Sequence, residues 1–91
     1  MPVMETSLVI TNKVGLHARP AALLVQTAAK FQAKIQVQLD ERTVNAKSIL
    51  NVLKLGATLG SIITVRAEGE DAEQAIAALT DLVHRNFDEK E

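Results

Sequence analysis

Apolar residues recur along this chain at every second position in some stretches and at every third or fourth position in others. The clearest alternation runs from 33 to 40, where Ile35, Val37 and Leu39 lie on one side and lysine and glutamine on the other. A strand with one apolar and one polar face is typical of an antiparallel sheet that is covered on a single side. We therefore expect a sheet with one face in water.

Three further stretches have the composition of strands. Apolar and β-branched residues dominate 5–12, while 43–46 follows a polar turn at 40–42 and can pair with 33–40 as a hairpin. The stretch 61–68 carries apolar side chains on both sides of its central Ile-Ile-Thr-Val. We therefore expect 61–68 to lie at the centre of the sheet.

Three other stretches show the residue spacing of amphipathic helices. The first begins near Ala18 and places small residues on its apolar face, and the second begins at Ser48 and ends at Gly56. The third follows Asp71 and keeps its apolar spacing as far as Phe87. Serine and aspartate favour the N-cap of a helix, and glycine favours the left-handed conformation that ends one.

The predicted order of elements is βαββαβα. A strand, a helix and an antiparallel hairpin, repeated in part, favour an α+β fold, an open-faced β-sandwich with three helices on one face of a four-stranded antiparallel sheet. The 91 residues, of which 47% are hydrophobic, suffice for one compact core and leave no room for a second. We expect a single domain over 1–91.

The second predicted helix is unusually apolar for its length. Its apolar residues point around most of its circumference: Ile49, Leu50, Val52, Leu53 and Leu55. They can all belong to a core helix with irregular patterning, or some can form an exposed patch that docks a protein partner. The pattern alone favours neither interpretation.

Charge and composition exclude several classes of function. The net charge is −1 and 2% of the residues are aromatic, so the chain lacks the basic surface and stacking side chains of a nucleic-acid-binding domain. It has no cysteine, and the glycines at 56 and 60 match neither the P-loop nor the dinucleotide fingerprint, so we interpret 56–60 as a plain turn. We expect no metal and no cofactor. No stretch resembles a secretion signal or a membrane span, which predicts a cytoplasmic protein without membrane insertion.

The candidate chemistry lies in Gly-Leu-His-Ala-Arg-Pro-Ala-Ala at 15–22. His17 stands between the first strand and the first helix, where the free N–H groups and the positive dipole end of that helix, near Ala18 and Pro20, face it. These surroundings disfavour the imidazolium and keep a nitrogen lone pair available, while Arg19 is placed to bind a phosphate. The sequence therefore suggests a phosphoryl acceptor. The alternative is a histidine that caps the helix or simply faces solvent.

The same stretch resembles the active-site signature of HPr, the histidine-containing phosphocarriers of the bacterial phosphoenolpyruvate:sugar phosphotransferase system. This family has the predicted element order, and 44–50 is similar to its regulatory-serine segment. The resemblance implies that His17 accepts a phosphoryl group on Nδ1 from phosphorylated Enzyme I and passes it to the IIA domain of a sugar permease, with Arg19 as the phosphate clamp. It implies a carrier in a multi-protein system and not a stand-alone enzyme.

The resemblance also gives Ser48 a second role besides that of a helix cap. In family members that have HPr kinase/phosphorylase, the matching serine is phosphorylated. A charge at this position would weaken the approach of Enzyme I and favour a regulatory partner such as a catabolite-control transcription factor.

The docking patch implied by the resemblance consists of Ile49, Leu50 and Leu53. Asn51 and Lys54 on the same helix depart from the Gram-positive type, which usually has glycine at the first position and often serine at the second. These departures leave the transfer chemistry untouched and bear on which kinase or transcriptional partner recognises the helix.

Other functions stay open on the sequence alone. An HPr-like protein of a nitrogen branch, or a purely regulatory one, keeps the same residues without feeding sugar uptake, and a binding module uses the helix after Ser48 only. Because the partners must reach the surface around His17 in turn, we expect a monomer.

Overall fold

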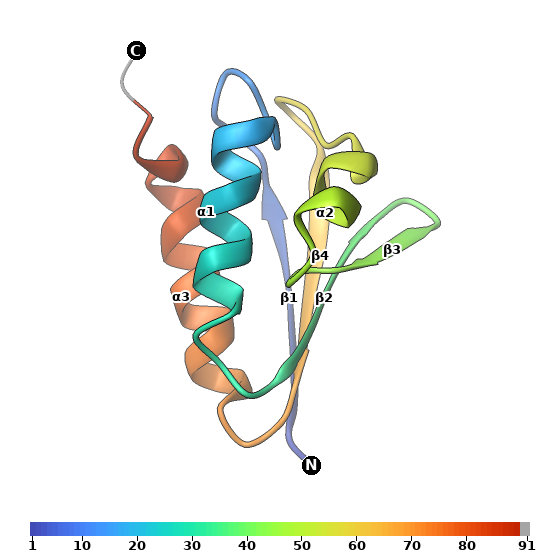
Figure 1. Cartoon of the computed structure of the whole chain (residues 1–91), viewed down its shortest axis with the longest axis vertical. Coiled ribbons are helices and arrows are strands. Elements are labelled where there is room, and N and C mark those ends of the chain that lie inside the picture. The colour runs from blue at the N-terminus through green and yellow to red at the C-terminus, as the bar shows by residue number, and fades with distance from the viewer. Residues whose placement is uncertain (90–91) are drawn as a thin grey trace.

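A computed structural model describes residues 1–89 and contains the predicted elements in the predicted order; residues 90 and 91 of the predicted domain lie outside the described part. The elements are β1 (Val3–Val9), α1 (Ala18–Ala28), β2 (Lys34–Leu39), β3 (Arg42–Asn45), α2 (Ile49–Leu55), β4 (Ile62–Glu68), α3 (Ala72–His84) and the 3-10 helix η1 (Asn86–Asp88). The strands form one antiparallel sheet in the order β1-β4-β2-β3, and Figure 1 shows α1, α2 and α3 on one side of it. The predicted open-faced β-sandwich is confirmed.

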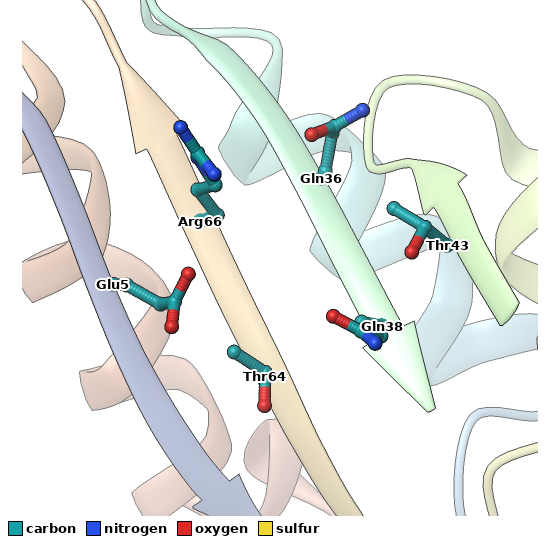
Figure 2. A pocket seen from close by; sticks show the side chains of 6 residues that line it. All are labelled: Glu5, Gln36, Gln38, Thr43, Thr64 and Arg66. Carbon is teal, nitrogen blue, oxygen red and sulfur yellow. The ribbon is translucent and has the colours of Figure 1, made fainter. Parts of the chain in front are cut away.

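The two faces of the sheet differ as the alternation predicts. Side chains on the helix side are buried, among them Leu8, Ile35, Val37, Ile63 and Val65. The opposite face carries a polar pocket, which Figure 2 shows lined by Glu5, Gln36, Gln38, Thr43, Thr64 and Arg66. The helices therefore leave this second face of the sheet open to water.

The central position of β4 is confirmed, but the reason given for it is wrong. Strand β4 lies between β1 and β2, yet its open face carries Thr64 and Arg66, and Ile62 on that face is 61% exposed. Neighbouring strands pair with β4 along both of its edges. Its central place thus comes from hydrogen bonding on two sides and not from two covered faces.

The first strand begins and ends earlier than the predicted 5–12. It spans Val3–Val9, and its last contacts with the neighbouring chain segment are made by Ile10, whose N–H donates to the Ser61 carbonyl at 2.8 Å and whose carbonyl accepts from Gly60 at 2.8 Å. The chain then turns away from the sheet. Residues 11–16 therefore form the loop that leads to His17.

The third helix ends at His84, before the apolar spacing ends at Phe87. Asn86, Phe87 and Asp88 have φ angles of 53–57°, in the left-handed region, and the change of conformation breaks the helix. Phe87 is nevertheless 1% exposed. It joins the core from η1 instead of from α3.

Asp71 occupies the predicted N-cap position of α3, but the expectation that its side chain caps the helix is wrong. Its two carboxylate oxygens accept hydrogen bonds from the backbone N–H groups of Gln32 and Ala33, both at 2.8 Å. The bond from Gln32 is the main cause that holds the pKa of Asp71 below its ordinary value, and the bond from Ala33 acts in the same direction. Asp71 therefore ties the start of α3 to the turn between α1 and β2.

We expect Asp71→Asn to lower the free energy of unfolding at neutral pH. Because folding lowers the pKa of this carboxyl, its contribution is fully present above the unfolded-state pKa and is lost as the pH falls through the folded-state pKa. Urea unfolding of parent and variant at a series of pH values should show the widest gap at neutral pH and a closing gap in acid. A gap of constant size at all pH values would contradict the role given to the charge.

Candidate functional site

His17 occupies the N-cap position of α1 and is exposed to solvent. Its backbone carbonyl accepts a hydrogen bond from the Ala21 N–H at 2.9 Å, whereas its imidazole makes no capping hydrogen bond. The structure therefore excludes that the side chain of His17 caps the helix, which was one of the two alternatives to a phosphoryl acceptor. The imidazole is open to any partner that approaches from solvent.

The first turn of α1 offers backbone donors next to His17. Ala18 and Arg19 hold the first two helical positions and are exposed, and Pro20 holds the third and is buried. First-turn N–H groups have no carbonyl partner within the helix, and proline has no N–H to leave unpaired. Two N–H groups at the positive end of the helix dipole are therefore available to an anion.

The side chain of Arg19 is the cation nearest to His17 in the sequence. Within residues 1–89 its guanidinium has no hydrogen-bond or ion-pair partner. It is therefore not committed to a structural contact in the described part of the chain, which suits a side chain that binds a phosphate.

The loop before His17 is held by the loop that follows α2. Gly15 has a φ of 64°, and the Leu16 N–H donates to the Ala57 carbonyl at 3.0 Å. The Leu16 side chain is 3% exposed and anchors the loop in the core. The stretch 56–60, interpreted above as a plain turn, therefore supports the residue directly before His17.

Ser48 is the N-cap of α2, as predicted. Its Oγ accepts a hydrogen bond from the Asn51 N–H at 3.4 Å, and its carbonyl accepts from the Val52 N–H at 3.0 Å. Gly56, with a φ of 71°, ends the helix in the left-handed conformation. Capping residues at both ends hold this short helix.

The structure buries some of the apolar residues of α2 and exposes others. Val52 and Leu55 are buried, whereas Ile49, Leu50 and Leu53 are 41%, 66% and 37% exposed. The three exposed residues are those that the family resemblance selects as a docking patch, a name we keep for them below. Such a cluster is the composition expected at the centre of a protein interface.

Helices α1 and α2 lie side by side (Figure 1), and they are in contact. Because Ala57 directly follows the end of α2 and binds Leu16, the docking patch and the loop of His17 belong to neighbouring segments. His17 and Ser48, 31 positions apart in the sequence, therefore begin two helices that are in contact, and the loop of His17 binds the segment after the end of α2.

Asn12 holds the loop before His17, and no pattern in the sequence predicts this. This residue is 1% exposed, and its side-chain amide donates to the Gly15 carbonyl at 2.8 Å. A polar residue next to a turn is expected at the surface, so its sequence position carries no signal of burial.

Within residues 1–89, no three His, Cys, Asp or Glu side chains are grouped so as to hold a metal ion, and no helix there has the length and apolar character to cross a membrane. The pocket of Figure 2 is lined by residues of the open sheet face and does not include His17.

Comparison with known proteins gives consistent matches over nearly the whole chain. The family model described as the PTS HPr component phosphorylation site matches residues 4–85. The phosphocarrier protein HPr of Xylella fastidiosa (strain 9a5c) is 47% identical over 87 residues, which cover 96% of this chain and 98% of the relative.

Solved structures of similar proteins agree with the fold. The crystal structure of HPr-C-His from Thermoanaerobacter tengcongensis superposes with a TM-score of 0.93 at 50% identity and covers 97% of this chain and 99% of that one. The crystal structure of an HPr dimer from the same organism superposes with a TM-score of 0.78 at 51% identity, covering 94% and 99%.

We expect Gly15→Ala to destabilise the protein more than Gly60→Ala. A Cβ on Gly15 would lie 2.5 Å from the Ala57 oxygen and 2.7 Å from the Thr58 Cα, whereas a Cβ on Gly60 meets no atom within 4 Å. Both glycines have a positive φ, so Gly60→Ala carries the backbone strain alone, about 1–2 kcal/mol, and Gly15→Ala carries about 1–3 kcal/mol more from the clash. Urea unfolding of both variants measures the difference. Equal losses of unfolding free energy in the two variants would mean that the loops of Gly15 and Ala57 can move apart at no cost.

Proposed function

The chain belongs to the HPr family of phosphocarrier proteins of the phosphotransferase system, and from this premise we propose that His17 is the residue that carries the phosphoryl group. The observation that supports it is an exposed histidine at the start of α1, beside the N–H groups of Ala18 and Arg19. The family places the protein among carriers and not among stand-alone enzymes.

In the proposed transfer, the Nδ1 lone pair of His17 attacks the phosphorus of the phosphohistidine on Enzyme I. The N–P bond of the donor breaks as the new N–P bond forms, and the donor imidazole keeps the electron pair. The phosphoryl oxygens then face the first-turn N–H groups and the guanidinium of Arg19, which stabilise their charge. In the second transfer, the histidine of a IIA domain attacks the phosphorus, the N–P bond to His17 breaks with its electron pair left on Nδ1, and the group passes on to a sugar permease.

The proposed transfer requires only that the chain position His17 and supply positive charge beside it. Phosphoryl transfer depends mainly on alignment and on electrostatic stabilisation of the transferred group. An exposed His17 can be aligned by each partner in turn, and its accessibility is what a carrier needs. We accordingly propose a single-domain, cytoplasmic protein that acts as a monomer, although a related chain has been crystallised as an HPr dimer.

The docking patch is the proposed contact surface for Enzyme I and the IIA domains. Ile49, Leu50 and Leu53 together form an exposed apolar surface on the helix that contacts α1. Burial of such side chains under a partner supplies the affinity, while His17 supplies the chemistry.

Ser48 is the proposed site of regulatory phosphorylation by a kinase of the HPr kinase/phosphorylase type. Its side chain is half-buried, and its Oγ is at the start of α2, where the helix dipole favours negative charge. The added dianion would lie next to Ile49, oppose the approach of Enzyme I and create a new contact for a catabolite-control transcription factor. Asn51 and Lys54 lie on the same helix and would affect which regulatory partner binds.

We expect the protein to gain one acid-labile phosphoryl group when it is incubated with phosphoenolpyruvate, Mg²⁺ and Enzyme I of the same organism. His17→Ala should gain none because it lacks the nucleophile, and its unfolding midpoint should stay close to that of the parent because residue 17 is exposed. Intact mass and circular dichroism measure the two properties.

Arg19→Lys and Arg19→Ala serve as graded controls in this assay. Both should still gain one group, at a rate that falls from arginine to lysine to alanine as the charge and the planar guanidinium are removed. A folded parent protein that gains no group would contradict the carrier role and would favour a regulatory module that uses the helix after Ser48.

We expect Leu50→Ser to weaken the interaction with Enzyme I about tenfold, in the range of a single interface contact. Ile62→Ser is the matched control, since Ile62 is 61% exposed, close to the 66% of Leu50, but lies on the open sheet face. The dependence of the transfer rate on protein concentration measures the affinity, and the rate at saturation should not change.

Ser48→Asp tests the regulatory part of the same surface. A charge at the start of α2 should lower the affinity for Enzyme I in the same assay. An unchanged affinity in both Leu50→Ser and Ser48→Asp, with the transfer itself intact, would contradict the proposed docking patch and leave the role of His17 standing.

A further inference from the structure

Asn12 is the one polar residue among 1–89 whose side chain is buried, at 1% exposure. Its Nδ2 donates to the Gly15 carbonyl at 2.8 Å and to the Glu89 carboxylate, 3.1 Å from Oε1 and 3.3 Å from Oε2. Its Oδ1 is buried and has no hydrogen-bond partner in the described part of the chain. Because the Gly15 carbonyl and the Glu89 carboxylate are both acceptors, the side-chain amide of Asn12 binds them through its two N–H groups.

The hydrogen bond from Asn12 is one of two that hold the peptide group before His17. The carbonyl of the peptide between Gly15 and Leu16 accepts from Asn12, and the N–H of the same peptide donates to Ala57 at 3.0 Å. Held at both ends, this peptide cannot rotate without breaking one of the two bonds. The next residue is His17, so the peptide plane sets the direction in which the chain reaches the helix start.

The segment after α3 supports Asn12 from the other side. Asn86, Phe87 and Asp88 have φ angles near 55°, which non-glycine residues seldom adopt, so surrounding contacts must hold them. The Phe87 side chain is buried in the core, and the Thr11 hydroxyl donates to Asn86 Oδ1. Together with the bond from Asn12 to Glu89, these contacts fasten 86–89 to the loop of His17.

We propose that Asn12 is a positioning residue for His17, and that Glu89 holds Asn12 in the orientation that binds the Gly15 carbonyl. Asn12 touches neither the phosphoryl group nor a partner, and it acts through the peptide that precedes His17. This inference rests on the proposed role of His17 for its effect on transfer, whereas its effect on the loop does not depend on that role.

The loop itself is tested by the hydrogen-exchange rate of the Leu16 amide, measured by NMR. Asn12→Ala and Asn12→Asp should both raise this rate at least about tenfold, because the peptide loses one of its two fixed ends. The aspartate variant should exceed the alanine variant, since its carboxylate faces two acceptors. Glu41→Ala, at the exposed turn between β2 and β3, is the matched control for changes of a glutamate and should leave the rate unchanged.

Glu89 is tested by two substitutions. Glu89→Gln keeps an oxygen that accepts from Asn12 and should retain the protection of Leu16, while Glu89→Ala should reduce it. Because Glu89 acts through Asn12, the double variant Asn12→Ala with Glu89→Ala should be no worse than Asn12→Ala alone. Additive effects of the two changes would overturn the proposed link.

The combination of Asn12→Asp with Glu89→Gln separates positioning from stability. The amide introduced at position 89 can donate to the carboxylate introduced at position 12, which restores the tie between these two positions but not the bond to Gly15. We expect the unfolding midpoint to recover towards that of the parent, while transfer from Enzyme I to His17 stays reduced about tenfold, in the range that small misplacements cause. Recovery of both properties together would show a merely structural role and overturn the proposal.

The outcomes also separate this inference from the proposed function. If the parent accepts no phosphoryl group, the carrier role fails, and the Leu16 exchange rates still decide whether Asn12 holds the loop. If transfer is normal in the parent and in Asn12→Ala, or if the Leu16 amide stays protected in that variant, the positioning role is wrong.

Discussion

The close contact between the loop of Gly15 and the loop of Ala57 is the constraint on which the candidate site depends. It requires a residue without a side chain at 15, because a Cβ there would lie 2.5 Å from the Ala57 oxygen. It also requires a left-handed φ, which glycine adopts without strain. The contact joins the start of α1 to the end of α2. A single backbone approach therefore joins the segment of the exposed imidazole of His17 to the segment of the exposed apolar surface of α2.

The helices cover one face of the sheet, and the proposed site lies at the end of one of them. The sheet buries one face under α1, α2 and α3 and leaves the other open to water, so the core needs only one layer of helices. The proposed chemistry lies at the end of a helix and not in a pocket, which agrees with a family of phosphocarrier proteins. An enclosed site would shield the phosphoryl group better, but it would also keep out the acceptor.

Much of the fold could be predicted because local patterns decide it. The alternation of Ile35, Val37 and Leu39 marks the open-faced sheet, and Ser48 and Gly56 mark the ends of α2. The failures concern long-range contacts. Asp71 is a good cap by type, yet its carboxylate binds a turn 38 positions away, and the buried Asn12 binds Glu89, 77 positions away. Such pairings depend on how the elements come together in three dimensions, and no local signal contains them. The position of His17 was predictable, whereas the groups that hold its loop were not.

The difference between the inner and the outer side of α2 explains why this helix can expose three large apolar side chains to water. A helix of seven residues is too short to be stable by itself, and exposure of Ile49, Leu50 and Leu53 removes much of the burial that usually stabilises one. Its stability must come from Val52 and Leu55 in the core, from the cap at Ser48 and from the left-handed end at Gly56. These contacts all lie on the inner side or at the ends of the helix. Substitutions on the outer side of α2 should therefore leave the loop that carries His17 undisturbed.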